Sequence, residues 1–429
     1  MGGGERTLRR RRWVFALAAA STLVGATAAC GSSGSSGGGG AGGPSRPEPV
    51  GEPVDLAEAG LHELSPPPLA GDRIWGAVQV ATDHEVVLWG GLTDDGPYGA
   101  SSPRTMRTDG AVLSLDDGRW TEMPPAPFDE GLYDAAGFWD GTEVIVLGTE
   151  CEGEVPPATD GSPPACPAGP AAAAFDPASW SWRRLDPPPI PSSEYYETAV
   201  LGRSVAVGGD GVGSVTFGFD ADSITWDRAT ESWGTVPPPF PGEGDWSYTC
   251  ADPIARQIVA LPGVQPGGDA TELRVSAAGG DGWSSPLAVD VGIDISPTCG
   301  DGHLTSSALV GGPVDGTDLR SEGVLVDTST GAVSPAFDPV PDLRSSWIVG
   351  PWLFARSSVA IGDIEGKDVP KPTSVRLVRG GETVEVPDDA ALPSFDGLYL
   401  PGVGLFTSVD GETGTPRLVI WRPPPELQP

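Results

Sequence analysis

The chain has 429 residues, which is enough for two or three average domains or for one large repeat array. Its 62 glycines and 47 prolines accompany 14 tryptophans and a hydrophobic content of 38%, so a chain too polar to bury a core is excluded. The formal net charge of −34 at pH 7 would repel phosphate backbones and argues against nucleic acid as a partner.

The first thirty residues indicate export. Four arginines at 9–12 precede an apolar run over residues 13–29, which is short for a membrane-spanning helix and typical of a signal peptide. The run closes Ala26-Thr-Ala-Ala-Cys30, which resembles the lipobox of bacterial lipoproteins, although Thr27 stands where Leu is usual. The resemblance implies that Cys30 is acylated and that the protein is anchored at the outer face of the cell membrane. The alternative is ordinary cleavage after Ala28 or Ala29 and secretion.

The segment behind this cysteine predicts a tether. Residues 31–40 are glycine and serine only, a composition that behaves as a flexible linker. We therefore assign residues 1–29 to a signal peptide, 30–54 to a flexible Gly/Ser/Pro tether and 55–425 to a folded body. The excess of arginine over lysine, the lack of asparagine and the abundance of Ala, Gly and Pro are typical of a high-GC actinobacterium.

A phrase of tryptophan followed by prolines repeats along the body. It begins at Trp120, Trp182 and Trp233, with Leu61 in the tryptophan position of an earlier copy. Weaker copies begin at Trp283, Val333 and Val384. Successive copies lie about 50 to 62 residues apart, a spacing typical of repeat architectures. The two longest intervals contain insertions at 91–110 and 149–171.

Ahead of each phrase, shorter elements predict strands. Apolar runs that end in glycine occupy residues 86–91, 144–148, 205–209 and 307–312, and each predicts a buried strand that ends in a turn. A further element ends in an aromatic residue and aspartate, at 173–180 and 224–233. Each repeat therefore predicts four strands, and no long amphipathic helix is expected.

This order of elements resembles the kelch-type β-propeller. The kelch signature is a double glycine after an apolar run, then an aromatic–Asp–Pro–x–Thr–x–x–Trp turn, and residues 175–182 and 224–233 match it best. The resemblance covers residues 60–422, with the double glycine lost near 262 and 361 and the tryptophan lost in later repeats. It implies an all-β fold of four-stranded antiparallel blades, which pack radially because a lone sheet cannot bury both faces. The tryptophans are expected between the sheets.

The repeat count predicts seven blades. Six complete units run from about 71 to 388, and the seventh takes its three inner strands from 392–422 and its outer strand from the Leu61 phrase. That strand should pair antiparallel with residues 417–422 and pack Leu61 and Leu64 against the neighbouring sheet. Such closure would remove the open edges of the ring. The alternative is a linear array with free ends.

Four cysteines remain after Cys30, in a compartment where disulfides persist. Cys250 and Cys299 lie at matching points of neighbouring repeats, at the end of an innermost strand, so we expect them to pair. Cys151 and Cys166 bracket a Pro/Gly-rich insertion and are expected to close that loop. Four cysteines allow three pairings, and a different connectivity is the alternative.

The sequence offers few residues suited to catalysis or to binding a metal ion. His62, His84 and His303 occupy positions that should not converge, so neither a metal site nor a Ser–His–Asp triad is expected, and no cofactor is predicted. With 59 acidic residues, a two-carboxylate glycosidase site stays open as an alternative, although no pair stands out.

Aromatic and acidic residues gather in the loops at one end of the predicted ring. The loop that enters each blade and the loop after its second strand share this end, as do both insertions. The candidate binding residues are Trp75, Asp94, Asp95, Tyr98, Arg104, Tyr133, Tyr195, Tyr196, Trp246, Tyr248 and Trp347. Such residues around a concavity could hold a sugar or a cationic peptide. The alternative is that the aromatics pack the strand ends and the acids face water.

The function that these observations favour is non-catalytic binding. We expect a monomeric cell-surface lipoprotein whose loop face binds a protein, peptide or glycan. A carbohydrate-active enzyme that uses two carboxylates is the alternative. Two Asp or Glu side chains about 5–10 Å apart in a deep pocket would favour that enzyme.

Overall fold

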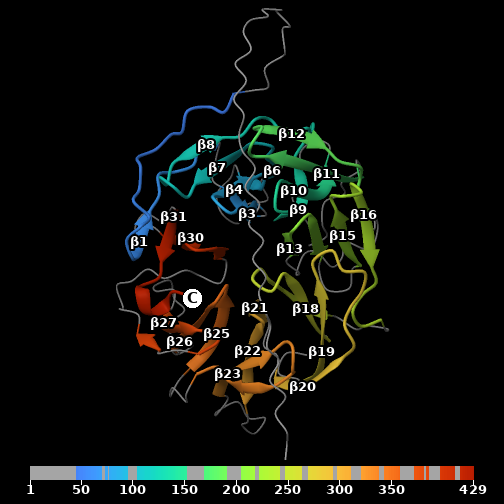
Figure 1. Ribbon diagram of the computed structural model, residues 1–429, viewed down its shortest axis with the longest axis vertical. Coiled ribbons are helices and arrows are strands. Elements are labelled where there is room, and N and C mark those ends of the chain that lie inside the picture. The colour runs from blue at the N-terminus through green and yellow to red at the C-terminus, as the bar shows by residue number, and fades with distance from the viewer. Residues whose placement is uncertain are drawn as a thin grey trace, which may run out of the picture. The chain divides into compact units, whose positions relative to one another are not determined.

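A computed structural model describes residues 45–69, 73–75, 77–94, 104–151, 169–190, 204–217, 222–241, 247–262, 269–292, 297–310, 320–337, 343–357, 372–380, 383–385, 397–410 and 416–429. The described chain is all-β, and its seven four-stranded antiparallel sheets form a propeller ring (Figure 1). One short 3₁₀ helix, η2 (Pro425–Leu427), follows the last strand. Within these ranges no helix is long and apolar enough to span a membrane. The predicted fold class and blade count are confirmed.

The blades follow one another along the chain. Blade 1 is β3 (Val78–Ala81), β4 (Glu85–Trp89), β7 (Gly110–Ser114) and β8 (Trp120–Glu122). Blade 2 is β9 (Leu132–Trp139), β10 (Val144–Glu150), β11 (Gly169–Asp176) and β12 (Ser181–Arg184). Blade 3 is β13 (Val205–Gly209), β14 (Val212–Thr216), β15 (Ser223–Asp227) and β16 (Ser232–Val236). Blade 4 is β17 (Ser247–Asp252), β18 (Gln257–Pro262), β19 (Asp269–Ala277) and β20 (Leu287–Gly292).

The remaining blades are shorter or composite. Blade 5 is β21 (Thr298–Gly300), β22 (His303–Val310), β23 (Arg320–Asp327) and β24 (Val333–Pro335). Blade 6 is β25 (Leu343–Val349), β26 (Trp352–Ser357), β27 (Pro372–Leu377) and β28 (Val384–Glu385). Blade 7 is β29 (Leu398–Leu400), β30 (Gly404–Asp410), β31 (Pro416–Arg422) and, from the other end of the chain, β1 (Gly60–Glu63).

The N-terminal strand closes the ring as predicted. β1 pairs antiparallel with β31, with Leu61 opposite Trp421, and Arg417 forms an ion pair of 2.8 Å with Glu63. One detail of the prediction is wrong. Leu64 is buried, but the Leu61 side chain is 42% exposed. Residues three apart on a strand point to opposite faces, so both leucines could not pack against the same sheet.

Neighbouring blades share layers of apolar side chains. Between blades 1 and 2, Trp89 contacts both Phe128 and Trp182, with ring centroids 5.5 and 5.9 Å apart. Trp226 and Trp233 of blade 3 lie 4.7 Å apart beside the apolar face of blade 2. These tryptophans are therefore part of the inter-blade core, as the resemblance implied.

The outer-strand tryptophans also bind the preceding blade. The indole N–H of each donates to a backbone carbonyl beside the prolines of the previous outer strand: Trp120 to Ser65 at 2.8 Å, Trp182 to Pro124 at 3.0 Å, Trp233 to Asp186 at 2.8 Å and Trp283 to Pro237 at 2.9 Å. We call this contact the indole clasp. The clasp explains why the Trp…Pro phrase repeats. The tryptophan of a phrase donates to the preceding blade, and a carbonyl beside its prolines accepts from the tryptophan of the following blade.

Residues 45–54, which the sequence assigns to the tether, lie along blade 1. The backbone of Val50 exchanges two hydrogen bonds with Trp120, of 2.7 and 3.0 Å. Arg46 forms an ion pair with Glu85 at 2.8 Å, and its guanidinium lies 4.3 Å from the ring centroid of Trp180 in blade 2. This segment covers the outer edge of β8, which an open sheet would leave unpaired.

The interblade disulfide is present. Cys250 of β17 and Cys299 of β21 are bonded across the innermost strands of blades 4 and 5, with their Cα atoms 5.6 Å apart. Cys151 is buried directly after β10. Cys166 lies outside the described residues, so the Cys151–Cys166 pairing stays a prediction, and so does lipidation of Cys30.

Candidate functional site

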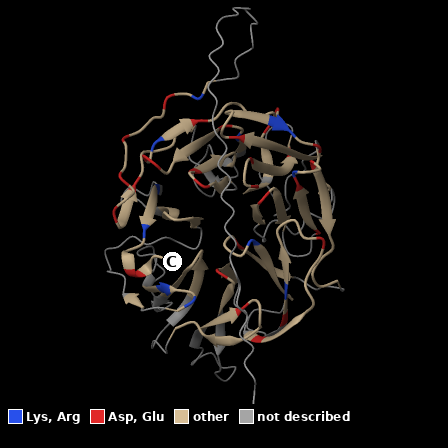
Figure 2. Cartoon of the chain, viewed as in Figure 1, with Lys and Arg blue, Asp and Glu red and all other residues tan. Residues whose placement is uncertain are grey.

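The ring has two faces with different loops. At the loop face the chain enters each blade and passes from the second strand to the third; at the turn face the first and second strands are joined. Charged residues are scattered over both the blades and their connections, and most strand residues are uncharged (Figure 2).

The insertion of blade 1 builds a second sheet on the loop face. β2 (Arg73–Trp75), β5 (Leu92–Asp94) and β6 (Arg104–Met106) form three antiparallel strands that continue β3, β4 and β7 beyond the blade. Trp75 lies opposite Leu92, and Leu92 lies opposite Met106. Asp94 lies opposite Arg104, an arrangement that suits residues of opposite charge on neighbouring strands.

This raised sheet adjoins the first strand of blade 2. Met106 is 8% exposed and packs with Cys151 and the partly buried Tyr133. The approach is close, because a Cβ added at Gly131 would lie 2.7 Å from the Cβ of Met106. In strand register, Trp75, Leu92 and Met106 lie on neighbouring strands of the raised sheet, and Met106 packs with Tyr133 of blade 2. Asp94 and Arg104 face each other in register at the end of the same hairpin. We call this set the loop-face row.

The structure brings four of the predicted binding residues together and separates two others. Trp75, Asp94, Arg104 and Tyr133 belong to the loop-face row. Tyr248 is 8% exposed in the core between blades 4 and 5, and Trp347 is 2% exposed and stacks on Phe354 with centroids 5.5 Å apart. These two aromatics present little surface to a ligand. The other candidates lie outside the described residues: Asp95, Tyr98, Tyr195, Tyr196 and Trp246.

Buried carboxylates of the described chain have structural partners. Asp252 accepts hydrogen bonds from the amides of Ile254, Ala255, Asp301 and Gly302, which joins the turns of blades 4 and 5. Asp140 accepts through Oδ1 from two amides of its own turn and from Arg228 at 3.1 Å, whereas its buried Oδ2 has no hydrogen-bond partner among the described residues. Glu150 accepts from the amide of Asp129 at 3.1 Å and from Arg184 at 2.5 Å. Each of these carboxylates therefore accepts hydrogen bonds from backbone amides, from an arginine, or from both.

A carboxylate outside the core also stabilises a turn through hydrogen bonds. Ser329 donates to Asp327 from both its hydroxyl and its amide, and these bonds lower the pKa of that carboxyl. No group of three His, Cys, Asp or Glu side chains suited to a metal ion occurs within the described ranges.

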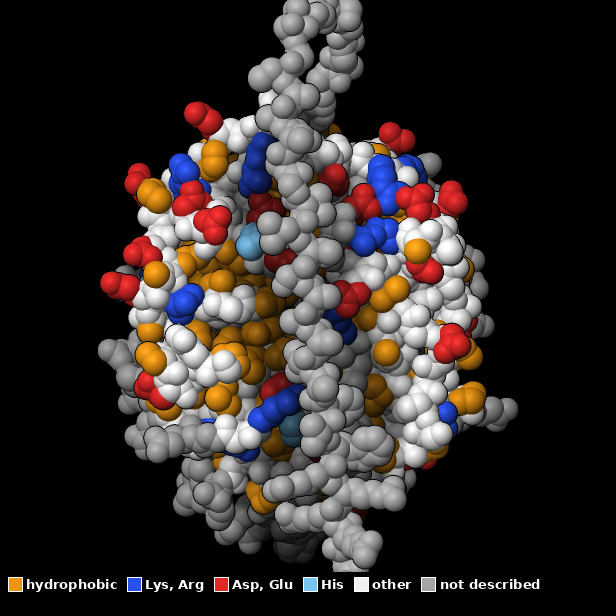
Figure 3. All heavy atoms as spheres, viewed as in Figure 1, with side chains coloured by type: hydrophobic (Ala, Val, Ile, Leu, Met, Phe, Trp, Pro, Cys, Tyr) orange, Lys and Arg blue, Asp and Glu red, His pale blue; other side chains and the backbone are white. Residues whose placement is uncertain are grey.

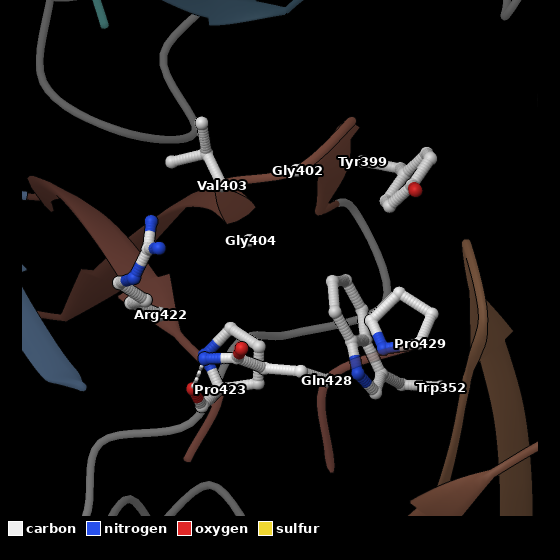
Figure 4. Close-up of a pocket in the computed structure, with 9 residues that line it drawn as sticks. All are labelled: Trp352, Tyr399, Gly402, Val403, Gly404, Arg422, Pro423, Gln428 and Pro429. Carbon is white, nitrogen blue, oxygen red and sulfur yellow. Dashed lines mark hydrogen bonds between the residues drawn. The ribbon is translucent and has the colours of Figure 1, made fainter. Parts of the chain in front are cut away.

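A cavity of about 130 Å³ lies on the turn face between blades 6 and 7 (Figure 4). Its walls come from β26, from β29 with the turn into β30, and from the chain that follows β31. The lining residues are Trp352, Tyr399, Gly402, Val403, Gly404, Arg422, Pro423, Gln428 and Pro429. In Figure 3, hydrophobic side chains gather on the visible face over the region of β30 and β31.

Local structure positions these walls. β30 starts at Gly404, where a Cβ would collide with the carbonyl oxygen of Trp421 on the neighbouring strand. Leu427 is 1% exposed in the core of blades 6 and 7, and its carbonyl accepts a hydrogen bond of 2.8 Å from the indole of Trp352. Residues 423–429 are thereby held across the two blades and form one side of the cavity.

Two polar groups of the cavity are distinctive. Burial raises the pKa of the Tyr399 phenol, and the negative charge of Asp301 raises it further. The Nε of Arg422 is buried and has no hydrogen-bond partner among the described residues. The sequence alone did not indicate this site, because its residues come from three separate segments without a shared motif.

Comparisons with known proteins identify no family for this chain. No family model matches the sequence, and no curated protein matches it. Among solved structures, that of YjhT aligns with a TM-score of 0.40 and 14% sequence identity, covering 63% of this chain and 86% of YjhT.

Proposed function

We propose that this chain is an exported, lipid-anchored propeller that binds a protein, peptide or glycan through its loop-face row without altering it chemically. The observation that carries the proposal is the raised sheet of blade 1, whose register places Trp75 opposite Leu92, Leu92 opposite Met106 and Asp94 opposite Arg104, while Met106 packs with Tyr133 of blade 2. Aromatic and arginine side chains dominate the energetics of recognition surfaces. The signal sequence and Cys30 motif support a location outside the cell.

The hydrogen bonds of the buried carboxylates favour binding over catalysis. A glycosidase needs one protonated and one ionised carboxyl group that both face the substrate. Asp140, Glu150 and Asp252, the buried carboxylates of the described residues, are instead bonded to backbone amides or arginines. Such groups stabilise turns and blade contacts.

The test uses the mature chain with Cys30→Ser, so that it can be purified without lipid. It is applied to a glycan array and to a displayed peptide library, and the ligands found are measured against two double variants. Asp94→Ala with Arg104→Ala removes both charged residues of the row. Asp210→Ala with Arg256→Ala removes an exposed ion pair on the turn face and is the matched control.

We expect the row variant, and separately Trp75→Ala, to weaken binding by about tenfold or more, because truncating a central contact residue commonly costs over about 1.4 kcal/mol. The control should bind like the parent. Ligands that ignore the row variants, or an absence of ligands in both libraries, would contradict the proposal. Release of new reducing ends from a bound glycan would instead indicate a glycosidase.

A further inference from the structure

We propose that the cavity between blades 6 and 7 binds a small ligand through its carboxylate group, with Arg422 as the cationic partner. This site is on the turn face, so it is separate from the loop-face row and does not depend on the function proposed above. Figure 4 shows Arg422 on one side of the cavity, Trp352 and Tyr399 on the other, and Gln428 between them.

The charge of Arg422 lacks a counterpart within the described chain. Other arginines of the same sheets are paired: Arg417 on the same strand contacts Glu63 at 2.8 Å, and Arg379 of blade 6 contacts Asp301 at 2.8 Å. Arg107 and Arg274 of the described chain also have a buried Nε without a partner, but of these three arginines Arg422 is the one that lines the cavity. The Nε has almost no accessible surface, so a ligand in the cavity would bind to the terminal nitrogens of the guanidinium.

The chemistry of the guanidinium selects the ligand. Arginine presents a planar fork of N–H donors that matches a carboxylate. Phosphate would also satisfy the fork, but a phosphate ion has no apolar part to place against Trp352 and Tyr399. A carboxylate with two or three carbons does, and it is small enough for a cavity of about 130 Å³.

The rest of the lining is compatible with an anion. The raised pKa of Tyr399 keeps its phenol neutral at physiological pH, so it remains a donor and adds no negative charge. The nearby Asp301 is held by Arg379, which offsets its charge. Gln428 donates its side-chain amide to the carbonyl of Pro423 at 3.5 Å, a long bond that leaves this amide adaptable at the cavity.

The test compares propionate with propionamide, which has nearly the same shape but no charge. Saturation-transfer NMR and thermal shift are measured on the mature Cys30→Ser chain. We expect saturable binding of propionate and none of propionamide. Arg422→Gln should weaken propionate binding by about tenfold or more, because a charge-assisted hydrogen bond is lost. Arg417→Gln, on the same strand, is the matched control and should bind like the parent.

Two further measurements keep the result decisive. Val403→Phe fills the cavity without changing its charge, so it should also abolish binding, and near-ultraviolet circular dichroism checks that each variant is folded. Acetyl-Ala-Ala with a free C-terminal carboxylate, compared with its amide, tells whether the carboxylate can belong to a peptide end or must be a free small acid. Equal binding of propionate and propionamide, or full binding by folded Arg422→Gln, would overturn the proposal.

Discussion

The indole clasp predicts a graded loss of stability when its tryptophans are replaced by phenylalanine. Trp120 is fully buried, so Trp120→Phe removes a hydrogen bond worth about 1 kcal/mol, leaves the carbonyl of Ser65 without its donor, and loses ring area worth about 1 kcal/mol. We expect a total of about 2–3 kcal/mol. At Trp233, which is only partly buried and bonds to the exposed Asp186, water can replace the donor, and the loss should be nearer 1 kcal/mol.

The control for this prediction is Trp226→Phe. Trp226 is 2% exposed, but its indole nitrogen has no hydrogen-bond partner among the described residues, so the change removes similar ring area and no clasp. The assay is urea unfolding of the mature chain followed by circular dichroism, with the midpoints compared at equal slope. If Trp120→Phe were no more costly than Trp226→Phe, the indole bond would contribute nothing measurable and the clasp would be a packing contact only.

Four other predictions concern the ends, the disulfide and the turns. Deleting residues 55–68 removes β1, so it should expose the edge of β31, lower the melting temperature and promote aggregation in light scattering, whereas deleting 31–44 should change neither. Cys250→Ala with Cys299→Ala should cost up to about 4 kcal/mol in urea unfolding, since the bond closes a 49-residue loop; an unchanged midpoint would contradict this. Cys30→Ser should release the protein from the membrane fraction, and intact mass should show an acylated Cys30 in the parent. The lowered pKa of Asp327 stabilises the fold above the unfolded carboxyl pKa of about 4, and this is lost as the pH falls through the folded pKa. The melting temperatures of Asp327→Ala and the parent should therefore converge between pH 6 and pH 2.

The propeller could be predicted from the sequence because each repeat carries its own contacts to the next. In blades 1 to 4 a tryptophan and a proline run recur, because the N–H of Trp182 meets the carbonyl of Pro124 and that of Trp233 meets the carbonyl of Asp186. The position of Cys250 and Cys299 within this period then identified the disulfide. The orientation of Leu61 was wrong, because the prediction placed two residues three apart on one face of a strand.

The sequence did not distinguish the aromatic residues that lie on the loop face from those that are buried between blades. Alternating Leu92-Thr-Asp and Arg104-Thr-Met could have predicted the raised hairpin, since both stretches have strand character and flank the insertion. Tyr248 and Trp347 have the same composition cue as Tyr133, yet they are buried in the core. Only the packing of blades 4 and 6 distinguishes them, and a single sequence does not contain that information.

The cavity lies where the repeat has lost its clasp. In blade 7 the tryptophan position of the outer strand is Leu61, which cannot donate a hydrogen bond to blade 6. The contact between these blades is made instead by Trp352 of blade 6, whose indole reaches the carbonyl of Leu427 beyond β31. The outer strands of blades 5 and 6 also lack the tryptophan, with Val333 and Val384 in its place, so losing the clasp is not enough to form such a site. Residues 423–429, which lie beyond the last strand, complete it by placing Gln428 beside the same cavity as Arg422 and Tyr399. Because this segment is not part of the repeat pattern, the pattern alone could not predict the cavity.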